Sequence, residues 1–215
     1  MTSSPSTNTE LVTDLPPLDS GAVVCPDGLI RPAWAASNEM LQNYYDHEWG
    51  MPVRDEYGMF ERLTLEGFQA GLSWVTILRK RERFRTVFED FVPDRIALFS
   101  EDKVAELLQD AGIIRNRAKI LATIKNAKAT IQLREDGGLA EFIWSFQPEL
   151  TPQPHRLMDV PTQSEESVAL SKALKKRDFG FVGPTTMFAL MEAVGIVDTH
   201  LMSSHRRGSS GVWPV

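Results

Sequence analysis

One glutamate, Glu66, lies next to apolar Leu65 in a segment suited to the interior of a helix. Aromatic residues precede and follow it along the chain, and these are Trp34, Tyr44, Trp49 and Trp74. Aromatic faces can stack on a planar ring such as a nucleobase, and a carboxylate can accept hydrogen bonds from an exocyclic amino group. The pattern therefore indicates a site for a flat, amino-bearing ring. The alternative is that the tryptophans fill the core and Glu66 is a solvated helix residue.

Residues 107–120 have the pattern of two helices joined by a tight turn that contains Gly112. Three basic residues, Arg115, Arg117 and Lys119, open the second helix. Free N–H groups at a helix N-terminus attract an anion, and a glycine lets the backbone approach a phosphate closely. Such a hairpin can grip a nucleic-acid strand without contacting its bases. An ordinary helical hairpin has the same pattern, so both interpretations stay open here.

Helices must position these residues, because apolar side chains recur at helical spacing between Asp55 and Gly195. Helix starts are indicated by Asp55, Ser73, Ser100 and Ser164 as caps and by Pro184 at a first helical position. Strand-like alternation is sparse, and residues 136–162 have the weakest pattern. The sequence therefore predicts an all-α fold.

The chain divides by composition into a tail, one domain and a short end. Residues 1–30 are predicted to be a disordered acidic tail, residues 31–207 the folded domain, and residues 208–215 a C-terminal tail. The formal net charge is −6, but residues 1–30 hold four acidic residues and no Lys or Arg. The rest holds basic clusters at 79–85, 115–119 and 172–177. Net charge therefore does not exclude DNA as a partner.

The sequence gives no sign of a membrane or secreted protein. No apolar window is long enough to span a bilayer, and the N-terminus lacks a basic stretch followed by an apolar one. The single cysteine, Cys25, excludes an intrachain disulfide and fits a reducing compartment. We therefore expect a cytoplasmic protein.

Four segments together resemble bacterial 3-methyladenine DNA glycosylase I, a family of the helix–hairpin–helix superfamily. They are YYDHEWG (44–50), LEGFQAGLSW (65–74), LLQDAGIIRNRAKI (107–120) and LSKALKKRDFGFVG (170–183), in the family's order and with similar spacing. The resemblance covers about residues 31–205. It implies a helical bundle with a cleft, acting as a monomer on double-stranded DNA that contains alkylated adenine.

The resemblance also implies roles for individual residues. Glu66 would contact the polar edge of a flipped base, with Tyr44 and Trp74 stacked on it and Trp49 and Trp34 completing the wall. Gln69, Gly71 and Leu72 would enter the gap left in the duplex. The DNA backbone would be held by Gly112, Ile113, Ile114, Arg115 and Lys119, with Lys175 and Lys176 as a second contact.

The implied reaction is hydrolytic release of 3-methyladenine without lyase activity. An N3-alkylated adenine is cationic and leaves as a neutral base, so a strong general acid is not needed. A damaged base also unstacks at lower cost than a normal one. Phe68 stands where a polar Gln is familiar in the family, which leaves the breadth of alkylated substrates open.

The chain departs from the family at a structural zinc site. Well-known members hold zinc with two cysteines and two histidines, and alignment of the motifs puts Pro32, Tyr45, His200 and Ser204 at those positions. Only His200 can ligate zinc well. A substitute site would need Cys25, His47 and His205 beside His200, and nothing in the sequence brings Cys25 or His47 to that place. We therefore expect no metal and no other cofactor.

Two rival interpretations remain. A glycosylase of the endonuclease III type needs a Lys nucleophile and an Asp after the hairpin, and the nearest such aspartate, Asp136, lies in a predicted turn. That type also carries a cysteine cluster, which this chain lacks. The other rival is a non-catalytic DNA-binding protein that keeps the fold, although such a protein would not need Glu66 with its aromatic neighbours.

Overall fold

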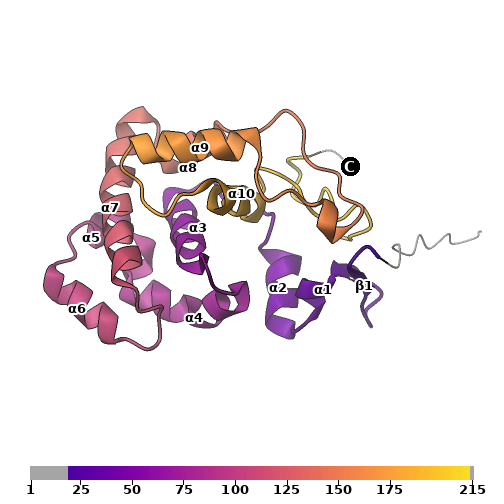
Figure 1. The fold of residues 1–215 in the computed structure, drawn as a ribbon, viewed down its shortest axis with the longest axis horizontal. Helices are drawn as coiled ribbons and strands as arrows, with labels where there is room; N and C mark the ends of the chain where they lie inside the picture. Colours follow the sequence, from indigo (N-terminus) through magenta and orange to yellow (C-terminus); the bar gives the residue numbers. More distant parts are fainter. Residues whose placement is uncertain (1–18, 214–215) are drawn as a thin grey trace, which may run out of the picture.

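The computed structural model describes residues 19–213, and this part of the chain is mostly helical (Figure 1). The α-helices are α1 (Ala33–Ala36), α2 (Glu39–His47), α3 (Glu56–Gln69), α4 (Trp74–Val87), α5 (Pro93–Ile96), α6 (Glu101–Gln109), α7 (Arg117–Leu133), α8 (Leu139–Trp144), α9 (Glu165–Lys176) and α10 (Pro184–Ala193). The 3-10 helices are η1 (Glu89–Phe91), η2 (Arg134–Asp136) and η3 (Leu157–Asp159). An antiparallel pair joins β1 (Ala22–Val24) to β2 (Ile30–Pro32). The predicted all-α class is confirmed, with this small sheet as an addition.

Local chemistry sets most of the helix boundaries. Asp55 and Ser164 cap α3 and α9 by accepting hydrogen bonds from backbone N–H groups of the first turn. Pro184 opens α10, where its missing N–H costs nothing. Asn116 caps α7 in the same way as Asp55 caps α3. The second helix of the predicted hairpin therefore begins at Arg117.

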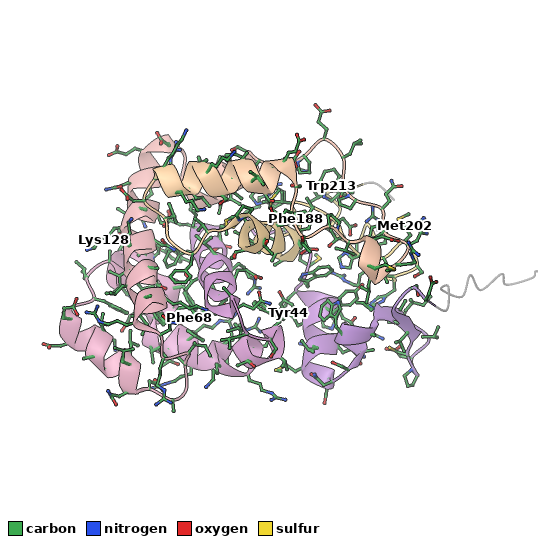
Figure 2. All side chains as sticks on the ribbon, viewed as in Figure 1. Tyr44, Phe68, Lys128, Phe188, Met202 and Trp213 are labelled. Atoms are coloured by element: carbon green, nitrogen blue, oxygen red, sulfur yellow. The ribbon has the colours of Figure 1, made fainter. Side chains whose placement is uncertain are left out.

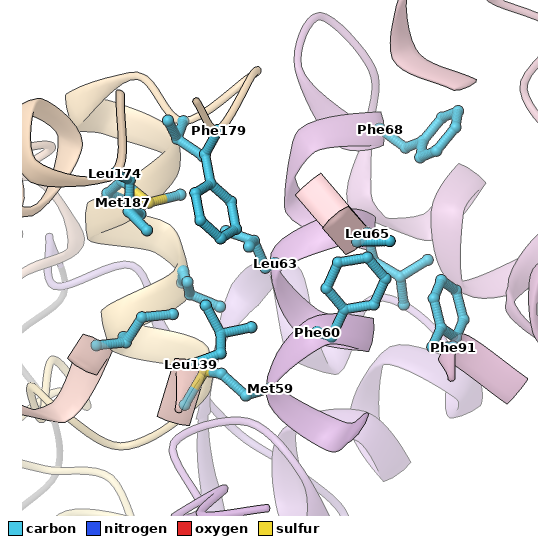
Figure 3. Packing of buried hydrophobic residues seen from close by; sticks show 14 of the residues in the cluster. Met59, Phe60, Leu63, Leu65, Phe68, Phe91, Leu139, Leu174, Phe179 and Met187 are labelled. Atoms are coloured by element: carbon cyan, nitrogen blue, oxygen red, sulfur yellow. The ribbon is translucent and has the colours of Figure 1, made fainter. Parts of the chain in front are cut away.

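The central helix is α3, which is buried at Met59 and Phe60 and then continuously from Leu63 to Phe68. Helices α4, α7, α8 and α10 pack against it. Figure 3 shows Phe60 and Phe91 on one side of α3 and Leu63 facing Phe179 on the other. A helix that is apolar around its whole circumference must be enclosed by others. Glu66 belongs to this buried stretch, so the fold places its carboxyl inside the protein.

The order of the N-terminal segment differs from the sequence prediction. Residues 22–24 pair with residues 30–32, so part of the predicted tail before Arg31 is folded. Arg31 itself is buried and forms ion pairs with Asp27 and Asp46. At the other end Trp213 is buried, within the segment predicted as a tail from residue 208. Residues 1–18, the rest of the predicted disordered tail, lie outside the described residues.

The segment after α10 returns to the N-terminal part of the described chain. His205 contacts the Ile30 carbonyl oxygen through Nδ1 at 2.9 Å and Asp46 Oδ1 through Nε2 at 3.2 Å. The C-terminal segment thus packs on β2 and α2 together. Within residues 19–213, no helix is both long and apolar enough to cross a membrane.

Candidate active site

A cavity of about 440 Å³ lies among α2, α3, α10 and the C-terminal segment. We call it the aromatic cavity, after the residues that line it. They are Pro32, Trp34, Tyr44, Tyr45, Trp49, Glu66, Gln69, Trp74, Leu157, Val160, Pro161, Thr162, Thr185, Phe188, Ala189, Glu192, Thr199, His200 and Leu201. Figure 2 shows Tyr44 on α2 and Phe188 on α10, two of the helices that bound it. A space of this size suits a small planar ligand.

Glu66 is the buried carboxyl of this cavity and is only 5% exposed. Burial and, to a lesser extent, the carboxyl of Glu192 together raise the pKa of Glu66 to about 8, and Arg62 opposes the shift. Burial acts in this direction because a carboxylate loses hydration energy inside a protein. A ligand that donates hydrogen bonds or carries positive charge would restore the ionised form.

The aromatic residues predicted as base contacts all line the cavity. The rings of Tyr44 and Trp74 lie 5.4 Å apart at 46°, and those of Trp34 and Trp49 lie 5.7 Å apart, edge to face. The ring of Tyr45 stacks on that of Trp49, with the two ring centres 5.6 Å apart. Burial raises the pKa of Tyr44 well above its usual range, so its hydroxyl stays neutral. The walls are therefore flat, uncharged faces.

The segment after α3 forms a tight turn at the edge of the cavity. Gln69 lines the cavity, and its carbonyl oxygen accepts a hydrogen bond of 2.6 Å from the N–H of Leu72. Gly71 has a φ of +84°, a conformation that favours glycine. The Leu72 side chain is 40% exposed. An apolar side chain presented on a tight turn is suited to contact stacked bases.

The hairpin between α6 and α7 is held by hydrogen bonds within the protein. Asp110 accepts from the N–H of Gly112 and from Arg83 Nε, each at 2.7 Å. A β-carbon on Gly112 would lie 2.6 Å from the Arg83 side chain, so glycine is needed there for close packing. Ile113 is buried, Ile114 is half-buried and Arg115 is exposed. Of these, Arg115 is the cation presented to solvent.

Lys119 was predicted to contact a DNA phosphate, but in the structure its ammonium is engaged within the protein. It is 8% exposed, and its Nζ donates hydrogen bonds to the carbonyl oxygens of Phe68 at 2.7 Å and Ala70 at 2.8 Å. Burial lowers the pKa of Lys119. Its ammonium therefore ties α7 to the C-terminal end of α3, where a cation is favourable. Lys175 and Lys176, by contrast, are exposed at the end of α9.

The basic cluster at residues 79–85 is largely paired with carboxylates. Arg81 Nη1 lies 2.6 Å from Glu48, which also pairs with Arg62. Arg85 pairs with Glu61 at 2.8 Å. Most of the charge of this cluster is therefore neutralised by acidic groups on α3, on the hairpin and directly after α2.

The sequence reasoning missed several residues of the cavity. The most polar of them is Glu192, which follows Thr185, Phe188 and Ala189 at helical spacing on α10. This spacing puts all four on one face of the helix. In the sequence, Glu192 could have been noticed as the one carboxyl on a helix face that is otherwise uncharged.

Of the four positions that the resemblance assigned to zinc, Tyr45, His200 and Ser204 meet in space, but the chemistry of the four does not fit zinc. The hydroxyls of Tyr45 and Ser204 lie 2.6 Å apart, and the rings of Tyr45 and His200 lie 5.2 Å apart. Proline has no donor, and hydroxyl groups are poor zinc ligands. Residues 19–213 contain no cluster of three or more His, Cys, Asp or Glu suited to a metal. His200 is the one residue of the four that could ligate zinc, and its Nδ1 already contacts Asp198 Oδ1 at 2.7 Å.

The family model described as methyladenine glycosylase matches residues 34–207. This chain belongs to the methyladenine glycosylase family. Its relatives in the family include DNA-3-methyladenine glycosylase 1 of Escherichia coli (strain K12), 46% identical over 176 residues, covering 80% of this chain and 94% of that protein. The DNA-3-methyladenine glycosylase of Haemophilus influenzae is 45% identical over 175 residues, with coverage of 80% and 94%.

Solved structures of family members share the fold. A crystal structure of 3-methyladenine DNA glycosylase I aligns with a TM-score of 0.76 at 44% identity, covering 79% of this chain and 95% of that one. A Staphylococcus aureus structure that describes 3-methyladenine recognition aligns with a TM-score of 0.76 at 32% identity, covering 81% and 95%. The resemblance stated from the sequence motifs is therefore confirmed at the level of family and fold.

Proposed function

We propose that this chain is a DNA glycosylase of base-excision repair that releases 3-methyladenine from DNA by hydrolysis. The observation that carries the proposal is one buried carboxyl, Glu66, in a cavity walled by neutral aromatic rings. The names of the relatives, DNA-3-methyladenine glycosylases, support this substrate.

The cavity suits an adenine ring in shape and in chemistry. Tyr44 and Trp74 offer faces for stacking on the purine, and Trp49 and Trp34 complete the wall. Glu66 accepts a hydrogen bond from the exocyclic amino group of the flipped base. Because the carboxyl is buried, a cationic base favours its ionised form, whereas a neutral base gains less from it.

Release of the base needs little acid catalysis. The C1′–N9 bond breaks with its electron pair going to the cationic purine, which leaves as neutral 3-methyladenine. Water adds its oxygen to C1′ and gives its proton to solvent. The protein contributes by binding the extruded base and by discriminating against bases that stay stacked.

Lyase activity is not part of the proposal. A lyase forms a Schiff base with an amine, and among residues 19–213 no lysine lines the aromatic cavity. Asp136, the aspartate that an enzyme of the endonuclease III type would need, is exposed in η2 and pairs with Arg177 at 3.5 Å. These positions support a monofunctional glycosylase.

The surface around the cavity supports double-stranded DNA as the partner. Leu72 and Gln69 at the turn after α3 would fill the space of the flipped nucleotide. Asp110 holds the N–H groups of Gly112 and Ile113 in the turn, so the N–H of Ile114 and the exposed Arg115 would contact phosphates, with Lys175 and Lys176 as a second contact. One cavity acting on one lesion needs only one copy of the chain, so we propose a monomer that works without metal.

The test is release of 3-methyladenine from methylated DNA, measured by chromatography under single-turnover conditions. We expect release by the wild type and roughly a 10- to 100-fold slower rate for Glu66→Gln, the loss expected for a hydrogen bond to a charged group. Borohydride should trap no covalent complex with DNA. If the wild type bound alkylated DNA but released no base, the chain would instead be a non-catalytic binding protein.

A further inference from the structure

Glu192 is a second carboxyl in the aromatic cavity. It lies on α10, on the face that also presents Thr185, Phe188 and Ala189 to the cavity. This helix faces α3, which carries Glu66 and Gln69 on its own cavity side. The cavity therefore holds two carboxyls, one from each of two packed helices.

A hydrogen bond from the C-terminal segment fixes the orientation of Glu192. Thr199 Oγ1 donates to Glu192 Oε1 at 2.6 Å, and Thr199 is itself buried. Among residues 19–213, no side chain or backbone group donates a hydrogen bond to Glu192 Oε2. Glu192 also keeps partial exposure while it lines the cavity. The second oxygen is thus available to a ligand.

Among residues 19–213, no Lys or Arg lines the cavity to balance two carboxylates. Its other titratable groups are Tyr44, Tyr45 and His200, and burial lowers the pKa of His200, which keeps it neutral. Arg62, on the helix of Glu66, is engaged by Glu48. Burial raises the pKa of Glu192 to about 7, although the bond from Thr199 opposes this, and Glu192 in turn raises the pKa of Glu66. A ligand with a positive charge would supply the missing cation.

We propose that Glu192 is a second base-recognition carboxyl that, with Glu66, makes the cavity prefer a positively charged purine over a neutral purine of the same shape. This inference rests on the proposed function. A cationic alkylated base is stabilised by both carboxylates, and its binding releases protons from the pair. A neutral base would leave at least one carboxyl protonated or two like charges uncompensated, which is unfavourable in a buried site.

The deciding variant is Glu192→Gln, which keeps the size of the side chain and removes its charge. Its release of 3-methyladenine should be about tenfold slower than that of the wild type at pH 7.5. Its affinity for a duplex with the neutral isostere 3-deaza-3-methyladenine should change by less than about twofold. Because Glu66 loses a like-charged neighbour, the acid limb of its rate profile should move to lower pH.

A matched control is Glu141→Gln, which changes an exposed glutamate of α8 outside the cavity and should behave as the wild type. Thr199→Val gives a second route if Glu192→Gln does not fold, since it removes only the hydroxyl that orients the carboxyl. It should lose rate on the cationic lesion and keep affinity for the neutral isostere.

The outcomes separate this inference from the proposed function. If Glu192→Gln matched the wild type in rate and pH profile while Glu66→Gln was impaired, the second carboxyl would have no role and the glycosylase function would stand. Equal losses on cationic and neutral lesions would show a purely structural role and would also overturn the inference. A wild type that released no base would overturn both.

Discussion

The hydroxyl oxygens of Tyr45 and Ser204 lie 2.6 Å apart, although 159 positions separate the two residues in the sequence. Both are buried, and Ser204 Oγ also lies 3.3 Å from the carbonyl oxygen of Ile30, to which it can donate. The contact joins α2, β2 and the C-terminal segment at the positions where family relatives are expected to hold zinc. A hydrogen bond between hydroxyls therefore joins segments that lie far apart in the sequence.

Loss of the Ser204 hydroxyl should weaken this junction. Ser204→Ala leaves the buried Tyr45 hydroxyl without its partner, which costs about 1–3 kcal/mol of unfolding free energy. Thermal unfolding measures this as a lower Tm, and the exposed Ser209→Ala is the matched control. Chelator should leave the wild-type Tm unchanged. One equivalent of tightly bound zinc in protein purified without a His-tag would contradict this account.

Glu66 should make the stability of the free protein fall as the pH rises. Its folded pKa of about 8 lies above the ordinary value of 4.5, so the folded state retains a proton that the unfolded state has lost between these values. Stability is then greatest near pH 4.5 and declines towards pH 8. Glu66→Gln should match the wild type below pH 4.5 and exceed it by roughly 4 kcal/mol at pH 8, because each pKa unit corresponds to about 1.4 kcal/mol.

The measurement is denaturant unfolding of both proteins across this pH range, with Glu141→Gln as an exposed control. Glu192, whose pKa is also raised, continues to lower stability in the variant, so some decline with pH should remain. A constant difference between Glu66→Gln and wild type at every pH would show that ionisation of Glu66 is not the cause.

Lys119 should behave as a structural residue. Lys119→Met removes the donor to the Phe68 and Ala70 carbonyl oxygens and should lower the unfolding free energy by about 2 kcal/mol. The dependence of DNA affinity on salt should stay unchanged, because no phosphate contact is lost. A reduced salt slope with unchanged Tm would restore the DNA-backbone role predicted from the sequence.

Arg115 should show the opposite behaviour. It is exposed at the hairpin, and Arg115→Ala should reduce the slope of log affinity against log salt by about one. The free energy of unfolding should stay within about 0.5 kcal/mol of the wild type. Binding to a duplex at several salt concentrations measures this. Arg95→Ala, which changes an exposed arginine of α5, is the control and should leave the slope unchanged.

The sequence by itself determined the helical class, most helix starts and the family. These features are local: Asp55 and Ser164 cap the helices that follow them, and the four motifs lie in continuous stretches. The aromatic residues and Glu66 could be selected because their types suit a planar ligand, and all of them line one cavity. The sequence also showed that Pro32, Tyr45 and Ser204 are unsuited to zinc.

The tertiary structure decided which charges are free and which are used within the protein. Lys119 was predicted to contact a phosphate, but α7 packs its ammonium against the end of α3. The basic cluster at 79–85 is likewise engaged within the protein, since Arg81 pairs with Glu48. Glu192 became a cavity residue only when α10 packed on α3. These outcomes depend on which distant groups meet. A side chain has the same local pattern whether its partner across the fold is a carboxylate, a carbonyl or a ligand, and only packing supplies that partner.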